Sequence, residues 1–66
     1  MTLKLNGKNI ETGGAISLSA LLEKYSLRSK PIVIELNGAI ITSDHYDEIV
    51  LNAGDALEIV RLVGGG

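Results

Sequence analysis

The group in this sequence that is best suited to chemistry is the carboxyl end of the chain. Gly64, Gly65 and Gly66 follow an apolar run there, and a segment without Cβ atoms can enter a channel too narrow for any side chain. Three extended residues reach roughly 10 Å, enough to carry the terminal carboxyl from a folded surface into the active site of a partner. A carboxylate is ionised at neutral pH and is a poor electrophile. We therefore expect Gly66 to react only after another protein has activated it.

The rest of the sequence offers only weak candidates for a second chemical site. The cluster that most resembles a metal or acid–base site combines three acids with one imidazole: Asp44, His45, Asp47 and Glu48. Its spacing matches no metal-ligand pattern, and His45 has no second imidazole or thiolate to join it. The serines lack a convincing His–Asp relay. We predict structural or solvent-exposed roles for this cluster, no metal site, and no enzymatic activity of the chain itself.

The composition narrows the classes of function. The chain has 66 residues, which suits one small domain, and no cysteine, which removes disulfides, thiolate metal sites and cysteine nucleophiles together. A formal charge of −2 and 3% aromatic residues provide neither the basic field nor the stacking surface typical of nucleic-acid binding. No stretch approaches the ~20 apolar residues of a membrane span. We expect a soluble, cytoplasmic protein with no nucleic-acid or membrane partner.

The first half of the chain predicts a hairpin and one helix. Residues 2–5 alternate polar and apolar, Asn6-Gly7 suits a type I′ turn, and residues 8–12 can return as the second strand. Ser17 is typical of a helix N-cap. The apolar stripe after it has helical spacing: Leu18, Leu21, Leu22 and Tyr25. The solvent side is expected to carry Ser19, Glu23, Lys24 and Ser26. We predict a helix over residues 18–27 that ends before Pro31, because proline disfavours the α conformation in the preceding residue.

The second half of the chain predicts mainly strands. Residues 32–36 are β-branched and almost wholly apolar, as in an interior strand, and Asn37-Gly38 is a second type I′ signal before a returning strand at 39–41. Residues 42–47 are polar and predict a single capped turn, residues 48–51 a short edge strand, and residues 56–63 the final strand.

Together these elements place one helix across one face of a mixed four- to five-stranded sheet. This is an α+β arrangement of the β-grasp type, and its two layers bury the apolar stripe of the helix. We expect a single domain over residues 1–63, followed by a flexible glycine tail over residues 64–66.

The final strand predicts a surface for a partner. Leu57 and Ile59 alternate with Glu58, Val60 and Leu62, so burying the first pair turns the other three toward the opposite face. Exposed apolar residues that gather near one another usually mark an interaction surface. The alternative is that another element covers this face. We predict a partner-binding surface formed by Glu58, Val60, Leu62 and Val63.

Three segments together resemble the ThiS family, the small sulfur carrier proteins of thiamin biosynthesis. They are residues 33–38, the Asn52-Ala53-Gly54-Asp55 turn, and the run from Glu58 to Gly66. The resemblance covers nearly the whole chain, including its length and the helix after the first hairpin. Family members often end in two glycines, whereas this chain ends in three. The related small subunit of molybdopterin synthase is similar, but it is generally longer and richer in aromatic residues around the core.

The resemblance implies a ubiquitin-like β-grasp fold whose terminal glycine is the working group. A ThiF-type adenylyltransferase would use ATP and magnesium to convert the Gly66 carboxylate into an acyl-adenylate. Sulfur from a cysteine desulfurase, delivered as a persulfide, would then replace AMP and leave a thiocarboxylate for thiazole synthase (ThiG). Gly64 and Gly65 would form the flexible arm, and the chain itself would bind no cofactor.

Three other functions stay open at the level of sequence. The same fold and tail are found in sulfur donors of molybdopterin synthesis, and ubiquitin-like modifiers use such a tail to form isopeptide bonds with lysines. A plain interaction domain with incidental glycines is the third, because chain ends tolerate glycine without any function. A thiocarboxylate would support either carrier, and isopeptide-linked adducts would support the modifier.

Overall fold

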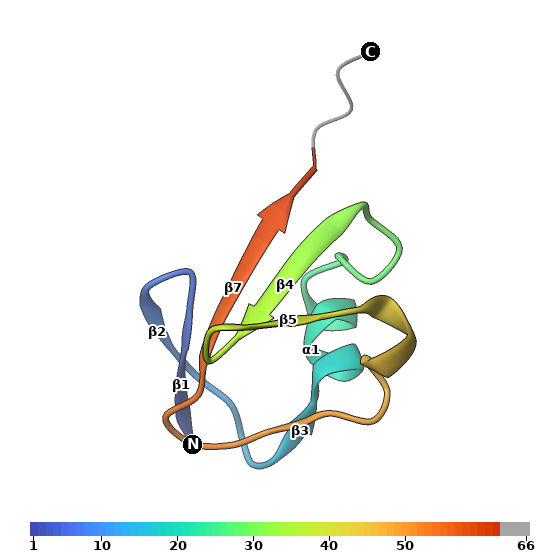
Figure 1. Cartoon of the computed structure of the whole chain (residues 1–66). Coiled ribbons are helices and arrows are strands. Elements are labelled where there is room, and N and C mark those ends of the chain that lie inside the picture. The colour runs from blue at the N-terminus through green and yellow to red at the C-terminus, as the bar shows by residue number, and fades with distance from the viewer. Residues whose placement is uncertain (63–66) are drawn as a thin grey trace.

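The computed structural model describes residues 1–62, and Val63 to Gly66 lie outside the described residues. Its main element is a five-stranded sheet with the strand order β2-β1-β7-β4-β5 (Figure 1). The strands are β1 (Thr2–Leu5), β2 (Lys8–Glu11), β4 (Ile32–Leu36), β5 (Ala39–Ile41) and β7 (Ala56–Arg61). β1 and β7 are parallel, and the other neighbouring pairs are antiparallel. A mixed sheet with one helix across it therefore agrees with the prediction.

Both predicted Asn-Gly turns connect hairpins of this sheet. Asn6 and Gly7 have φ angles of +50° and +82°, and Asn37 and Gly38 have φ angles of +50° and +88°. Positive φ at both central residues defines a type I′ turn, whose twist matches that of the flanking strands. The local chemistry of these two dipeptides therefore sets the register of both hairpins.

The helix α1 (Leu18–Lys24) begins as predicted and ends earlier than predicted. Ser17 caps its start, since the Ser17 hydroxyl accepts a hydrogen bond from the Ala20 N–H at 3.0 Å. At the other end Ser26 adopts a left-handed φ of +58°, and the Leu27 N–H bonds back to the Leu22 carbonyl at 2.7 Å. This reversal is a Schellman-type ending. The predicted range of 18–27 was wrong because the reversal ends the helix well before Pro31.

The core fills the space between α1 and one face of the sheet. Its fully buried side chains come from the helix and from strands of both sheets: Leu3, Leu18, Leu21, Leu22, Ile34, Leu51 and Leu57. Two predictions about the helix faces were wrong. Tyr25 is 42% exposed because the helix has already ended there, and Ser19 is buried, where its hydroxyl donates to Asp47 Oδ1.

A second, two-stranded sheet closes the far end of the core. It pairs β3 (Ile16–Ser17), which the sequence did not predict, with β6 (Val50–Leu51). The predicted edge strand over residues 48–51 is therefore shorter and belongs to this small sheet. The predicted turn before it is the 3-10 helix η1 (Ser43–His45). The predicted cap was wrong, because the Thr42 side chain makes no capping hydrogen bond at its start. None of the helices within residues 1–62 is long and apolar enough to cross a membrane.

Candidate functional site

The strand that leads to the glycine tail is β7, and it occupies the centre of the sheet. It has β1 on one side, with Leu5 opposite Leu57, and β4 on the other, with Ile34 opposite Ile59. After β7 the Leu62 N–H donates to the Pro31 carbonyl at 2.8 Å. The strand before the tail is therefore paired on both sides at its start, and β4 accompanies it to its end.

The asparagines of the two type I′ turns also bind β7. Asn6 Oδ1 accepts a hydrogen bond from the Ile59 N–H at 2.7 Å, and Asn37 Oδ1 accepts one from the Ala56 N–H at 2.9 Å. Asn37 Nδ2 further donates to Asp55 Oδ1 at 3.0 Å. The sequence predicted the turns and missed these contacts, although an asparagine at the first turn position offers an acceptor that glycine lacks.

The side chains of β7 alternate between the two faces of the sheet, as predicted. Leu57 is buried and Ile59 partly buried, whereas Val60 is 58% exposed and Leu62 is 51% exposed. Glu58 is also exposed and shares the face of Val60. No element within residues 1–62 covers Val60 or Leu62. The binding of a partner to them stays a prediction, and the remaining predicted site residues, Val63 to Gly66, lie outside the described residues.

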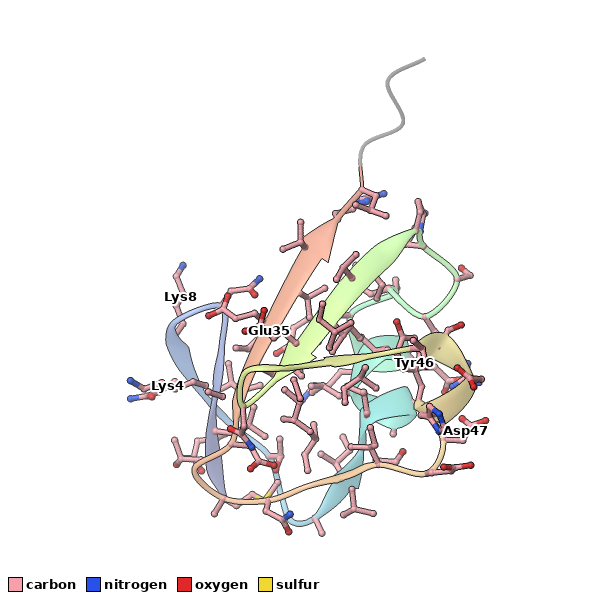
Figure 2. All side chains as sticks on the ribbon, in the orientation of Figure 1. Lys4, Lys8, Glu35, Tyr46 and Asp47 are labelled. Atoms are coloured by element: carbon pink, nitrogen blue, oxygen red, sulfur yellow. The ribbon has the colours of Figure 1, made fainter. Side chains whose placement is uncertain are left out.

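Two residues of neighbouring strands join this exposed face. Glu35 on β4 lies opposite Glu58 on one side and opposite Ile40 of β5 on the other. Ile40 is 69% exposed, and Glu35 is exposed as well (Figure 2). We define the outer face as Glu35, Ile40, Glu58, Val60 and Leu62. Glu35 and Ile40 were not predicted from the sequence, because their position beside β7 depends on strand register. The alternation of Glu35 with the apolar Ile34 and Leu36 could still have indicated that Glu35 faces outward.

The fold separates the predicted acidic cluster into two groups: Asp44 and Glu48 lie beside His45, whereas Asp47 binds Arg28. His45 Nδ1 lies 3.2 Å from Glu48 Oε2, and His45 Nε2 lies 3.5 Å from Asp44 Oδ2. Hydrogen bonding to Glu48, with the charges of Asp44 and Glu48, raises the pKa of His45. All three side chains are exposed. Within residues 1–62 no group of three or more histidine, cysteine, aspartate or glutamate side chains is arranged to hold a metal ion.

Asp47 has a different partner. Arg28 Nη1 and Nη2 donate to its two carboxylate oxygens at 2.8 and 3.3 Å, and Ser19 donates to Oδ1 as well. The hydrogen bond from Arg28, followed by that from Ser19, lowers the pKa of Asp47. These contacts tie the segment after η1 to the helix and to the loop behind it. Asp47 therefore has a structural role, in agreement with the prediction.

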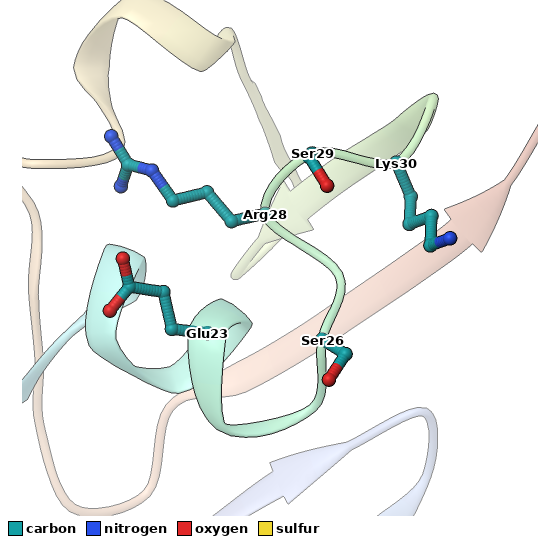
Figure 3. A pocket seen from close by; sticks show the side chains of 5 residues that line it. All are labelled: Glu23, Ser26, Arg28, Ser29 and Lys30. Carbon is teal, nitrogen blue, oxygen red and sulfur yellow. The ribbon is translucent and has the colours of Figure 1, made fainter.

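A hollow of about 560 Å³ lies beside the carboxyl end of α1 (Figure 3). Five side chains from the helix and the following loop line it: Glu23, Ser26, Arg28, Ser29 and Lys30. The lining combines two serine hydroxyls with one carboxylate and two cationic side chains, and none of the five is a histidine or cysteine. Arg28 is already engaged by Asp47.

Comparison with known proteins identifies what this arrangement is similar to. The model of the ThiS family matches residues 3–66. The sulfur carrier protein ThiS of Bacillus subtilis (strain 168) is 40% identical over 68 aligned positions, which cover 97% of this chain and 98% of that protein. The crystal structure of a thiamine biosynthesis protein (ThiS) from Geobacter metallireducens superimposes with a TM-score of 0.85 at 29% identity, and the match covers both chains fully. The fold is accordingly the β-grasp fold.

A third relative is much longer than this chain. The thiazole synthase of Paramagnetospirillum magneticum (strain ATCC 700264 / AMB-1) is 33% identical over 66 positions, which are 100% of this chain and 20% of that protein. The chain thus spans about one fifth of the length of this relative. The matching stretch in that protein is part of one polypeptide with a far larger remainder.

Proposed function

The chain belongs to the ThiS family, and on this premise we propose that it is a sulfur carrier of thiamin biosynthesis with Gly66 as the site of attachment. The observation that carries the proposal is the family match, which extends through residue 66 and so includes the three glycines. The absence of cysteine from the sequence agrees with it. A chain without a thiol of its own has its terminal carboxyl as the plausible place for sulfur.

The chemistry begins with activation of the terminal carboxylate by a partner. A carboxylate oxygen of Gly66 attacks the α-phosphorus of ATP bound with magnesium in a ThiF-type adenylyltransferase. Pyrophosphate leaves, and the product is an acyl-adenylate, a mixed anhydride whose carbonyl carbon is electrophilic. The side chains of the described residues take no part in this step. They provide the outer face on which the enzyme docks.

Sulfur transfer then replaces AMP. The terminal sulfur of a cysteine persulfide, formed by a cysteine desulfurase, attacks the acyl carbon and expels AMP, which leaves an acyl disulfide. A thiol of the partner cleaves the S–S bond, so that the thiocarboxylate is released and the partner is oxidised to a disulfide. The sulfur is now bound to the carbonyl carbon of Gly66, ready to be donated.

Thiazole synthase is the proposed acceptor. The support for it is the relative from Paramagnetospirillum magneticum, a protein named thiazole synthase that contains a stretch similar to this whole chain. Two partners that act in sequence are often found fused, because the link raises their effective concentration. This observation favours thiazole formation over molybdopterin synthesis as the destination of the sulfur.

The intact mass of the chain tests the proposal. The purified chain is incubated with the adenylyltransferase, ATP, magnesium and a cysteine desulfurase with cysteine. We expect exchange of one oxygen for one sulfur, mapped by fragmentation to the carboxyl-terminal peptide. The matched control is a synthetic chain with a carboxamide end, which keeps every side chain and removes the reacting carboxylate. Sulfur gained by the control, or no sulfur gained by the parent, would contradict the proposal.

A further inference from the structure

The two strands that flank β7 do not cover it equally. β4 accompanies it along its whole length, from Leu36 opposite Leu57 to Ile32 opposite Arg61. β1 stops much earlier, and its last pair is Leu5 with Leu57. Figure 1 shows the result: the half of β7 nearest the tail has a strand on one side and open space on the other. This half of β7 is an edge, although β7 is the central strand of the sheet.

The backbone groups on that edge follow from the hydrogen bonds. Asn6 N–H donates to the Leu57 carbonyl at 2.8 Å and Asn6 Oδ1 accepts from Ile59 N–H, so odd-numbered residues of β7 direct their polar groups toward β1. The Leu62 N–H bonds to Pro31 on the β4 side, as alternation requires. The Ile59 carbonyl and both backbone groups of Arg61 therefore point to the open side. Within residues 1–62 they form no hydrogen bond.

We propose that this edge accepts an extended segment of the adenylyltransferase, which adds a strand to the sheet beside Ile59 and Arg61. The inference rests on the proposed function and names the part of the chain that guides the tail into the enzyme. Addition of a strand to an open edge is a common mode of recognition, in which the main chain supplies affinity and the alternate side chains supply specificity.

The side chains beside the edge define the chemistry of the added segment. On the outer face it meets the exposed apolar side chains of Val60 and Leu62. On the opposite face it meets the exposed cation Arg61, and Lys8 extends from the tip of the β1–β2 hairpin (Figure 2). A strand that fits this edge alternates apolar with acidic side chains. Charge complementarity thus selects a partner segment with aspartate or glutamate opposite Arg61.

A second copy of the chain fits the same edge poorly. Two β7 strands that pair antiparallel about this short edge bring Arg61 of one copy next to Arg61 of the other. Like charges directly opposite each other in a sheet are destabilising. An acidic segment of the enzyme meets no such repulsion, and its pairing fixes the backbone just before the tail. The terminal carboxyl is then delivered in one direction, which favours the geometry of attack on ATP.

The test removes the Arg61 N–H without removing the fold. Arg61→Pro lacks the donor, and proline is tolerated at an edge whose N–H faces solvent. Arg61→Ala is the first control, because it removes the charge and keeps the N–H. Asn9→Pro is the second, since alternation along β1 and β2 directs the N–H of the exposed Asn9 to the free edge of β2, away from the outer face. Affinity for the adenylyltransferase is measured by calorimetry for all four chains.

We expect Arg61→Pro to bind about tenfold more weakly than Arg61→Ala. Asn9→Pro, which removes an N–H at the other edge of the sheet, should bind as tightly as the parent. In the unmodified chain, exchange of the Arg61 amide hydrogen should slow when the enzyme is added. Equal affinity of Arg61→Pro and Arg61→Ala, or unchanged amide exchange, would overturn the inference alone. Failure of the parent to bind would overturn the proposed function with it. Protection of the Arg61 amide that rises with the concentration of the isolated chain would assign the edge to a second copy.

Discussion

His45 is held between two carboxylates on the surface of η1 and the segment after it. Its ring nitrogens lie 3.5 Å from Asp44 and 3.2 Å from Glu48. The hydrogen bond to Glu48 and the charges of both acids raise the pKa of His45 above its ordinary value of 6.5. The charged imidazole is thus favoured in the folded state, which links the stability of this segment to pH.

Stability should fall as pH rises through the titration of His45. A group whose pKa is raised by folding stabilises the folded state fully at pH values below its unfolded pKa, near 6.5 for histidine. This stabilisation is lost as the pH rises through the pKa of the folded state. We expect the difference in urea midpoint between the parent and His45→Gln to be larger at pH 5.5 than at pH 8, values on either side of the ordinary histidine pKa of about 6.5. A difference that stays constant with pH would show that the two carboxylates do not act on His45.

At the scale of elements, the turns do more than connect strands. Asn6 and Asn37 each occupy a left-handed position and each accept a hydrogen bond from β7. β1 ends just before Asn6, and the Asn6 side chain makes the next hydrogen bond to β7. Within the described residues it is the last hydrogen bond on that side of β7 before the open edge. The type I′ turns therefore determine both the register of the hairpins and the position of the strand that carries the tail.

Asn6→Gly should destabilise the chain relative to Asn6→Asp. Both replacements suit a type I′ turn, but only aspartate keeps an oxygen that can accept from the Ile59 N–H. The loss of one hydrogen bond predicts a free energy of unfolding lower by roughly 0.5–1.5 kcal/mol for Asn6→Gly. Chemical denaturation measures this difference, and amide exchange at Ile59 should be faster in the glycine variant. Equal stability of the two variants would mean that the side-chain contact contributes nothing.

Elements with local signals were predictable from the sequence. The Asn-Gly dipeptides predict their turns, Ser17 predicts the start of α1, and the alternation in residues 57–62 predicts which side chains of β7 face outward. The end of α1 was not predictable, because the left-handed residue there is Ser26, where glycine is the usual signal. The pair β3 and β6 was missed because strands of two residues show no periodicity.

The parts of the candidate site that depend on contacts between distant segments could not be predicted from the sequence. The contacts of Asn6 and Asn37 with β7, the place of Ile40 on the outer face and the open edge at Arg61 all depend on strand order and register. The pattern of one strand does not specify which strand lies beside it. The glycine tail needed no structure to be noticed, because its three glycines and their place after the final strand are read directly from the sequence.

At the scale of the molecule, one small core supports everything else. Leu21 and Leu22 are fully buried in this core, whereas Tyr25, which stands at the end of the helix, is exposed. Because a domain of this size is stabilised by only about 5–15 kcal/mol, a single cavity in the core threatens the whole fold. The side chains of the outer face contribute little to that core and are free to serve a partner.

Leu21→Ala should cost much more stability than Tyr25→Ala. Truncation of a buried leucine lowers the free energy of unfolding by about 2–5 kcal/mol, and the exposed position of Tyr25 predicts a smaller loss. Thermal and urea unfolding of the two variants provide the comparison, with Leu22→Ala as a second core variant. Similar losses at Leu21 and Tyr25 would contradict the placement of the helix on the sheet.

We infer that docking and reaction use two separate parts of the chain, the exposed side chains of β7 for docking and the glycine tail for reaction. Val60→Asp places a charge within the apolar contact of the outer face, where it is desolvated without a partner. Gly65→Val leaves that face intact, but its β-branched side chain obstructs a narrow channel and restricts the backbone. The first change should therefore affect binding, and the second should affect activation.

Steady-state release of pyrophosphate by the adenylyltransferase distinguishes these effects directly. With the chain as the varied substrate, we expect Val60→Asp to raise KM by at least about tenfold, the equivalent of ~1.4 kcal/mol of binding. Gly65→Val should lower kcat while its KM stays close to that of the parent. Activation of Gly65→Val at the parent rate, or an unchanged KM for Val60→Asp, would contradict the division of the molecule into a docking face and a reactive tail.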